Sequence, residues 1–178
     1  MASGTFTSGF NTVEFSGGNA AINTGGTATG KTFWHVEIDG TGTKSLASNV
    51  GVKGSLLITA GELQLSTYTM TVTGNWDSSA AGATFDSALG TVIFDGDGVS
   101  RTITTGGTGT GRSFYNIVLG DGNTSANTTD LASGDSLDVV HDLTITANNA
   151  LMINGTSSTD LLVGYTFSME GADSSNYA

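Results

Sequence analysis

The chain has 178 residues, with 16 acidic and 5 basic side chains and a formal net charge of −11 at pH 7. Because nucleic acid phosphates are bound by clustered Lys and Arg, this balance argues against a nucleic acid partner. The absence of Cys excludes disulfides, zinc ribbons and thiol nucleophiles, and no apolar run is long enough to span a bilayer, so we expect no membrane insertion.

An internal repeat organises the sequence. Residues 5–17 (TFTSGFNTVEFSG) return 79 positions later as residues 84–96 (TFDSALGTVIFDG). Further matches follow at offsets of 81 and then 87, so the insertions fall in the Gly-, Asn- and Ser-rich stretches between apolar positions. Self-similarity of this kind indicates a modular array. We divide the chain into copy 1, residues 1–82, and copy 2, residues 83–178, and expect them to stack as one continuous elongated domain.

Alternation of apolar and polar residues with a period of two predicts short strands throughout the chain. In chain order the clearest are residues 33–38, 62–65, 69–73 and 91–94. No segment carries a helical stripe with caps, and Thr, Val, Ile and aromatic residues take the place of helix formers. The protein is therefore expected to be all-β.

Two all-β architectures fit this pattern, a β-sandwich and a β-solenoid. Gly-Gly, Asp-Gly, Asn-Gly and Ser-Gly turns suit both. The drifting repeat offset favours the solenoid, because loops between coils can lengthen while the inward-facing residues stay in register. We predict a parallel β-helix with coils of roughly 20 residues and keep the sandwich as the alternative.

The rhythm of copy 2 resembles a known class of repeat. Residues 90–96, 102–103, 114–119 and 143–145 are similar to repeat arrays of large bacterial surface proteins of the autotransporter and filamentous-haemagglutinin-like kind. Phage fibre and virion surface proteins share this style. The resemblance covers most of the chain and lies in composition and rhythm. It implies a β-helical stalk or adhesive surface, with no catalytic residues to transfer.

One segment satisfies the spacing of a phosphate-binding loop, residues 25–32 (GGTATGKT). Such a loop needs a helix after it, whereas residues 33–38 alternate as a strand. The second copy carries Arg112 where the first has Lys31. We therefore interpret both segments as solvent-exposed turns with one basic residue.

Three acidic residues beside Gly resemble fragments of calcium loops: Asp95, Asp97 and Asp121. Hard cations favour several oxygen ligands on a flexible turn. The EF-hand spacing is absent, and ordinary turn chemistry also explains Asp-Gly pairs. Calcium is thus a candidate ligand of these turns, beside the expectation that the chain needs no cofactor.

A second function class is a glycan-binding adhesin or receptor-binding module. Exposed aromatic rings stack on sugar faces while Asn and Asp bind hydroxyls. The candidate rings are Trp34, Trp76, Tyr68 and Tyr115. The structural alternative for each is that it covers a loop or contacts a neighbouring subunit.

A third class is a polysaccharide-degrading enzyme, whose paired carboxylates would come from Asp86, Asp95, Asp97, Asp135 and Asp138. With so many acids on turns, some pair will lie close by chance. We expect no catalytic site and no enzymatic activity.

The function that we expect is structural. The chain would extend an extracellular fibre, stalk or virion surface, with itself or neighbouring repeats as partners and surface glycans as the alternative partner. Terminal coils of a solenoid present unpaired strand edges, which favours self-association. No basic patch and apolar stretch of a secretory signal follow Met1, so we expect the chain to be a piece of a larger surface protein.

Overall fold

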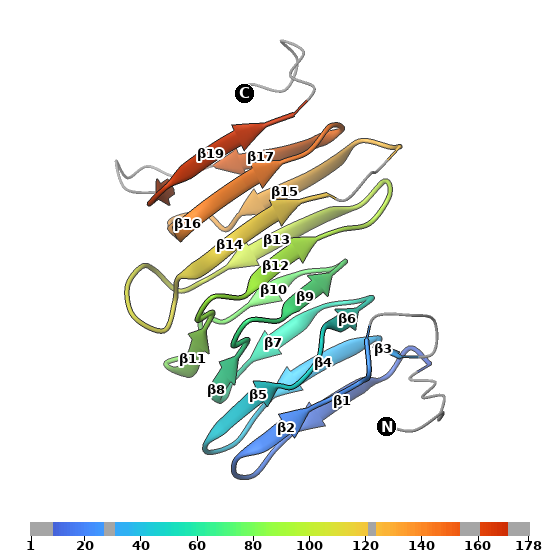
Figure 1. Cartoon of the computed structure of the whole chain (residues 1–178), viewed down its shortest axis with the longest axis vertical. Helices are drawn as coiled ribbons and strands as arrows, with labels where there is room; N and C mark the ends of the chain where they lie inside the picture. Colours follow the sequence, from blue (N-terminus) through green and yellow to red (C-terminus); the bar gives the residue numbers. More distant parts are fainter. Residues whose placement is uncertain (1–8, 27–30, 121–123, 154–160, 171–178) are drawn as a thin grey trace.

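The computed structural model describes residues 9–26, 31–120, 124–153 and 161–170. Within these ranges the chain forms strands and turns without a helix, so no helix there could cross a membrane. Every strand pairing is parallel. Three sheets stack coil upon coil into a β-solenoid of about six turns (Figure 1). The predicted all-β solenoid is confirmed, and the sandwich alternative is wrong.

Each sheet forms one side of the solenoid, and its strands follow the chain from one coil to the next. Sheet A contains β1 (Thr12–Phe15), β4 (His35–Ile38), β7 (Leu56–Ile58), β10 (Trp76–Asp77), β13 (Ser100–Thr104), β15 (Asn127–Leu131) and β17 (Asn149–Ile153). Sheet B contains β2 (Ala20–Ile22), β5 (Thr43–Leu46), β8 (Ala60–Gln64) and β11 (Gly82–Asp86). Sheet C contains β3 (Thr32–Phe33), β6 (Val50–Val52), β9 (Thr69–Val72), β12 (Thr91–Phe94), β14 (Phe114–Leu119), β16 (Leu137–Ile145) and β18 (Leu161–Val163), and β19 (Thr166–Met169) also pairs with β16.

The core is a set of apolar columns that run along the solenoid axis. Successive strand residues point to opposite faces, so every second side chain of a strand turns inward. In sheet A, Val36, Leu56, Trp76 and Ile103 follow one another in register, and all four are buried. The period-two alternation of the sequence is therefore the pattern of one inward and one outward face.

Coil length varies at the corners and not within the sheets. Val36 pairs with Leu56 and Leu56 with Trp76, an advance of 20 residues each time. Trp76 pairs with Ile103, 27 residues later, because the corners before β11 and after β12 are longer. In the next coil, residues 105–113 bulge out as a loop, and sheet B ends at β11. Long corners thus interrupt one side of the solenoid while the other two sides continue.

The two sequence copies do not superpose coil on coil. Ile22 of sheet B corresponds in the repeat to Ile103 of sheet A, and Leu46 of sheet B corresponds to Leu131 of sheet A. All four side chains are buried. These segments of copy 2 are therefore turned by one side of the solenoid relative to copy 1, whereas Phe33 and its repeat counterpart Phe114 both lie in sheet C. The boundary at residues 82 and 83 lies inside β11 without a break.

The widest coils contain a cluster of aromatic rings. The ring of Trp76 lies 4.7 Å from that of Phe85 and 5.1 Å from that of Phe114, measured between centroids. The indole N–H of Trp76 donates to Ser78 Oγ at 3.0 Å, which satisfies its one polar atom. Large rings fill the additional volume that the longer coils enclose.

We predict that Trp76→Ala lowers the free energy of unfolding by about 3–5 kcal/mol, the usual result of removing a large core ring. Urea denaturation followed by far-UV circular dichroism measures this change. The matched control is Leu89→Ala at an exposed turn, where the expected change is within about 0.5 kcal/mol. Equal effects of the two substitutions would contradict the buried position of Trp76.

Candidate functional site

Polar side chains at the corners connect successive coils. Asn19 Oδ1 accepts the backbone N–H of Thr43 at 2.9 Å, one coil further along. Asn75 Oδ1 accepts the N–H of Thr102 at the same distance. These bonds satisfy backbone donors where the chain turns between sheets. The corner Asn side chains thus hold one coil to the next.

Asp97, one of the calcium candidates, is such a link. Its carboxylate accepts N–H groups from Thr124 at 3.1 Å and Ser125 at 2.6 Å, and the Thr124 hydroxyl at 3.0 Å. The hydrogen bonds from Ser125 and Thr124 lower the pKa of Asp97. Asp121 lies outside the described residues. In the described part of the chain, no group of three or more His, Asp or Glu side chains is placed to hold a metal ion.

Asp95, the remaining calcium candidate, lies close enough to a buried cation for its negative charge to act on it. Arg101 points inward from β13 and is 2% exposed, and none of its guanidinium nitrogens has a hydrogen-bond partner in the described structure. Asp95 Oδ1 is likewise buried without a partner. Burial lowers the pKa of Arg101, and the negative charge of Asp95 opposes this shift. Asp95 thus serves as the counter-charge of an interior guanidinium.

We predict that Asp95→Asn lowers the free energy of unfolding by about 2 kcal/mol, because it leaves Arg101 buried without a counter-charge. Combining it with Arg101→Met removes both charges and should restore at least wild-type stability. A double-mutant cycle from urea denaturation gives the coupling energy. Additive effects of the two substitutions would show that the groups do not interact.

A second interior carboxylate, Asp135, organises the 105–113 loop. It accepts the hydroxyl of Thr105 at 2.8 Å and the N–H groups of Gly106 at 3.0 Å and Gly107 at 2.7 Å. Burial raises the pKa of Asp135, but hydrogen bonds from Gly106, Thr105 and Ser136 outweigh burial and leave the pKa below its ordinary value. Both oxygens of the carboxylate therefore accept hydrogen bonds from within the fold.

We predict that Asp135→Asn lowers the free energy of unfolding by about 1–3 kcal/mol at neutral pH, because an amide cannot accept all of these donors. Since the folded pKa lies below the unfolded one, this stabilisation is present above about pH 4. It is lost as the pH falls further through the folded pKa. Urea denaturation from pH 7 to pH 2 should therefore show the two proteins converging in acid, and a constant difference would contradict the assignment.

The loop of the second copy is also held in place by its basic residue. Arg112 Nη1 donates to the carbonyl oxygens of Ser78 and Thr105, and its Nη2 donates to Ala80 O at 2.9 Å. The expectation of a solvent-exposed basic residue is wrong for Arg112. Lys31 donates to Gly25 O at 3.2 Å, and β3 follows it directly, where a phosphate-binding loop would need a helix.

The four candidate sugar-binding rings occupy different environments. Trp76 is completely buried, so its place among the glycan candidates is wrong. Tyr68 packs against the hydrophobic core. The ring of Trp34 meets the exposed ring of Phe10 edge to face, at a centroid distance of 4.4 Å. Tyr115 lies outside the core with its ring parallel to that of His141.

Tyr115 begins a stack of three rings that runs along the axis. Its centroid is 4.8 Å from that of His141, which is 4.8 Å from that of Tyr165, and the planes are within 16° of parallel. The spacing equals the distance between neighbouring strands. The ring faces therefore cover one another, and Tyr165, which is 77% exposed, ends the stack. Sequence reasoning missed His141 and Tyr165 because the stack joins three separate coils.

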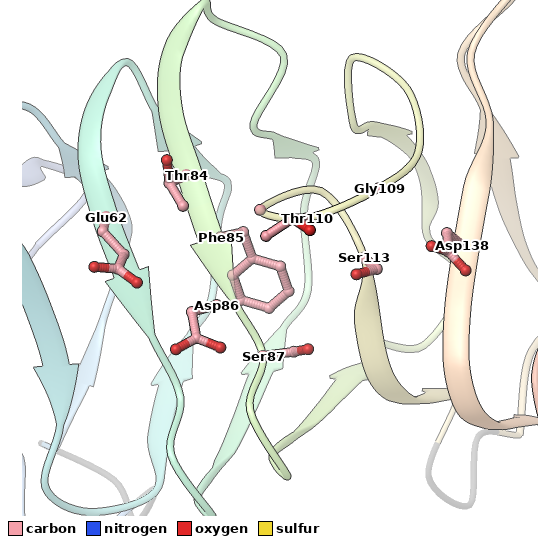
Figure 2. A pocket seen from close by; sticks show the side chains of 10 residues that line it. Glu62, Thr84, Phe85, Asp86, Ser87, Gly109, Thr110, Ser113 and Asp138 are labelled. Atoms are coloured by element: carbon pink, nitrogen blue, oxygen red, sulfur yellow. The ribbon is translucent and has the colours of Figure 1, made fainter.

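A polar hollow of about 580 Å³ lies where sheet B ends. Figure 2 shows Glu62 and Asp86 on one side of it and Asp138 beyond the 105–113 loop. Glu62 accepts the Thr43 hydroxyl at 2.6 Å, and Asp86 accepts the side-chain amide of Gln64 at 2.8 Å. Both carboxylates thus belong to hydrogen-bonded rows on the outer face of sheet B.

The last coil leaves its inward side chains uncovered. Ile117, Leu143 and Phe167 stand in one inward column of sheet C, and the first two are fully buried. Phe167 is 52% exposed because the described chain has no strand beyond β19 in this sheet. Ile153, the last inward residue of sheet A, is also exposed. An apolar column that ends in an exposed ring is an open core surface, suited to contact another molecule.

Comparison of the chain with protein-family models, with curated proteins and with solved structures finds no match.

Proposed function

We propose that the chain is a structural module of an extracellular fibre, stalk or virion surface, which associates with further copies through the ends of its coils. The observation that carries the proposal is the uncovered column at Phe167. Leu143 in this column is buried, whereas Phe167, one coil later, is exposed. The end of the column is thus as apolar as the core, but no further coil of the described chain covers it. Burying such a surface against another copy is favourable in proportion to the apolar area removed from water.

The backbone supports the same conclusion. The outer edges of β19 at one end and of β1 at the other have no strand beside them in the described structure (Figure 1). Unpaired edges of this kind are templates for another strand. Side chains and backbone at the ends of the solenoid thus favour the same kind of contact.

The glycan-binding alternative has less support from the candidate rings. Trp76 is in the core, both faces of His141 are covered within the ring stack, and one face of Tyr115 is covered by His141. Sugar binding needs a free ring face beside hydrogen-bonding groups. The hollow beside Asp86 offers carboxylates and hydroxyls, but its aromatic residue, Phe85, is 1% exposed.

We predict that Phe167→Lys weakens self-association by about tenfold or more, because it replaces an apolar contact worth about 1.5–3 kcal/mol with a charge. Sedimentation velocity over a wide concentration range, with electron microscopy of the same samples, measures the association. Wild-type protein should form larger species as the concentration rises.

Leu89→Lys is the matched control, since Leu89 is exposed on a turn in the middle of the solenoid. It should associate like the wild type. Far-UV circular dichroism of both variants checks that the fold is kept, and Ile153→Lys gives a second substitution at the open end if Phe167→Lys is misfolded. A wild-type chain that stays monomeric at every concentration would contradict the proposed function.

A further inference from the structure

We propose that the C-terminal end of the solenoid receives the N-terminal end of a second copy, so that chains join head to tail with sheets A and C continued in register. This inference rests on the proposed function, because it specifies which surface meets the open end. Three independent features lead to it: strand direction, column alignment and the distribution of charge.

Strand direction favours a head-to-tail contact. All pairings within the solenoid are parallel, and the chain passes through sheets A, B and C in the same order in each of the first four coils. Placing β1 of a second copy beside β17, and its β3 beside β19, extends both sheets in parallel. Two C-terminal ends related by a twofold axis across the solenoid would instead bring antiparallel edges together. Only the head-to-tail contact repeats the pairing that the solenoid uses throughout its described length.

The columns of the two ends are aligned. In sheet C, Thr32 pairs with Gly51, and the same column continues coil by coil to Thr144 and Ser168. The neighbouring inward column begins at Phe33 and ends at Met169. A second copy added without sideways shift therefore places its Thr32 beside Ser168 and continues their column.

Sheet A gives the same alignment independently. Val13 of β1 begins the column that ends at Ile153 of β17. Both residues are apolar, and Ile153 is exposed at its end. One placement of the second copy thus continues apolar columns in two sheets at once.

Charge distinguishes head-to-tail from tail-to-tail contact. Residues 1–60 contain three Lys and three acids, whereas residues 113–178 contain eight acids and no Lys or Arg. Two C-terminal ends would bring together regions with a net charge of −8 each, which repel one another. An N-terminal end is neutral overall and carries Lys31 and Lys53 in its first two coils. Electrostatics therefore selects the pairing that the strands and columns also select.

A head-to-tail contact joins two different surfaces of the molecule and does not close on itself. Each copy that is added presents a fresh C-terminal end. Such heterologous contacts generate open filaments when the rotation between copies does not close a ring. The expected assembly is a polar filament in which every chain points in the same direction.

The experiment uses single cysteines in a chain that has none of its own. Neighbouring strands place Cα atoms about 5 Å apart, within the range that a disulfide can bridge. We expect a mixture of Thr32→Cys and Ser168→Cys chains, oxidised under conditions of association, to give a disulfide-linked heterodimer. Each variant alone should give none. Non-reducing electrophoresis and mass spectrometry of the linked peptides identify the product.

Thr71→Cys is the matched control, because Thr71 lies in the same column in the middle of sheet C and should not link to Ser168→Cys. A disulfide formed by Ser168→Cys alone would show tail-to-tail contact and overturn the inference while leaving self-association intact. Filaments without the mixed disulfide would also overturn it. Absence of any assembly by sedimentation would instead contradict the proposed function, so the two failures are distinguishable.

Discussion

Each strand of the solenoid depends on strands one coil away for its backbone hydrogen bonds. A parallel ladder repeats at a single spacing of about 4.8 Å, and the side chains have to follow that spacing. Apolar residues therefore line up in inward columns, Asn and Asp side chains link corners, and three aromatic rings stack at the same interval on the outside. The same dependence leaves the outer edges of the first and last strands without a neighbouring strand in the described structure. The ends are therefore the part of the fold most able to bind another strand.

The fold class was predictable because it is encoded in local periodicity. Thr91, Val92, Ile93 and Phe94 alternate between outward and inward positions in β12, as their sequence pattern indicates. The internal repeat also indicated stacked coils correctly. Its orientation could not be read from the sequence, because identity between Ile22 and Ile103 shows that both face inward but does not show on which side of the solenoid.

The candidate site was less predictable, because its features depend on contacts between coils. Trp76 was mistaken for a surface ring although it lies 20 residues after Leu56, the interval of its own coil. Applying that interval would have placed it in the core. Arg101 lies two residues before the inward Ile103 in β13, so the period-two alternation did indicate that it faces inward. No comparable signal exists for Tyr165, which lies outside a strand. Asp97 and Asp135 looked like free acids in the sequence because their hydrogen-bond donors are contributed by neighbouring coils.

The turn of copy 2 relative to copy 1 has a consequence for any longer array built from the same unit. If each further copy advanced by one side, a given motif would appear on sheet A, then sheet C, then sheet B, and would return to its first side with the fourth copy. A recurring surface would then wind around the shaft like the thread of a screw. Such an array would present the same residues to its surroundings in every direction, although each single copy displays them on one side only.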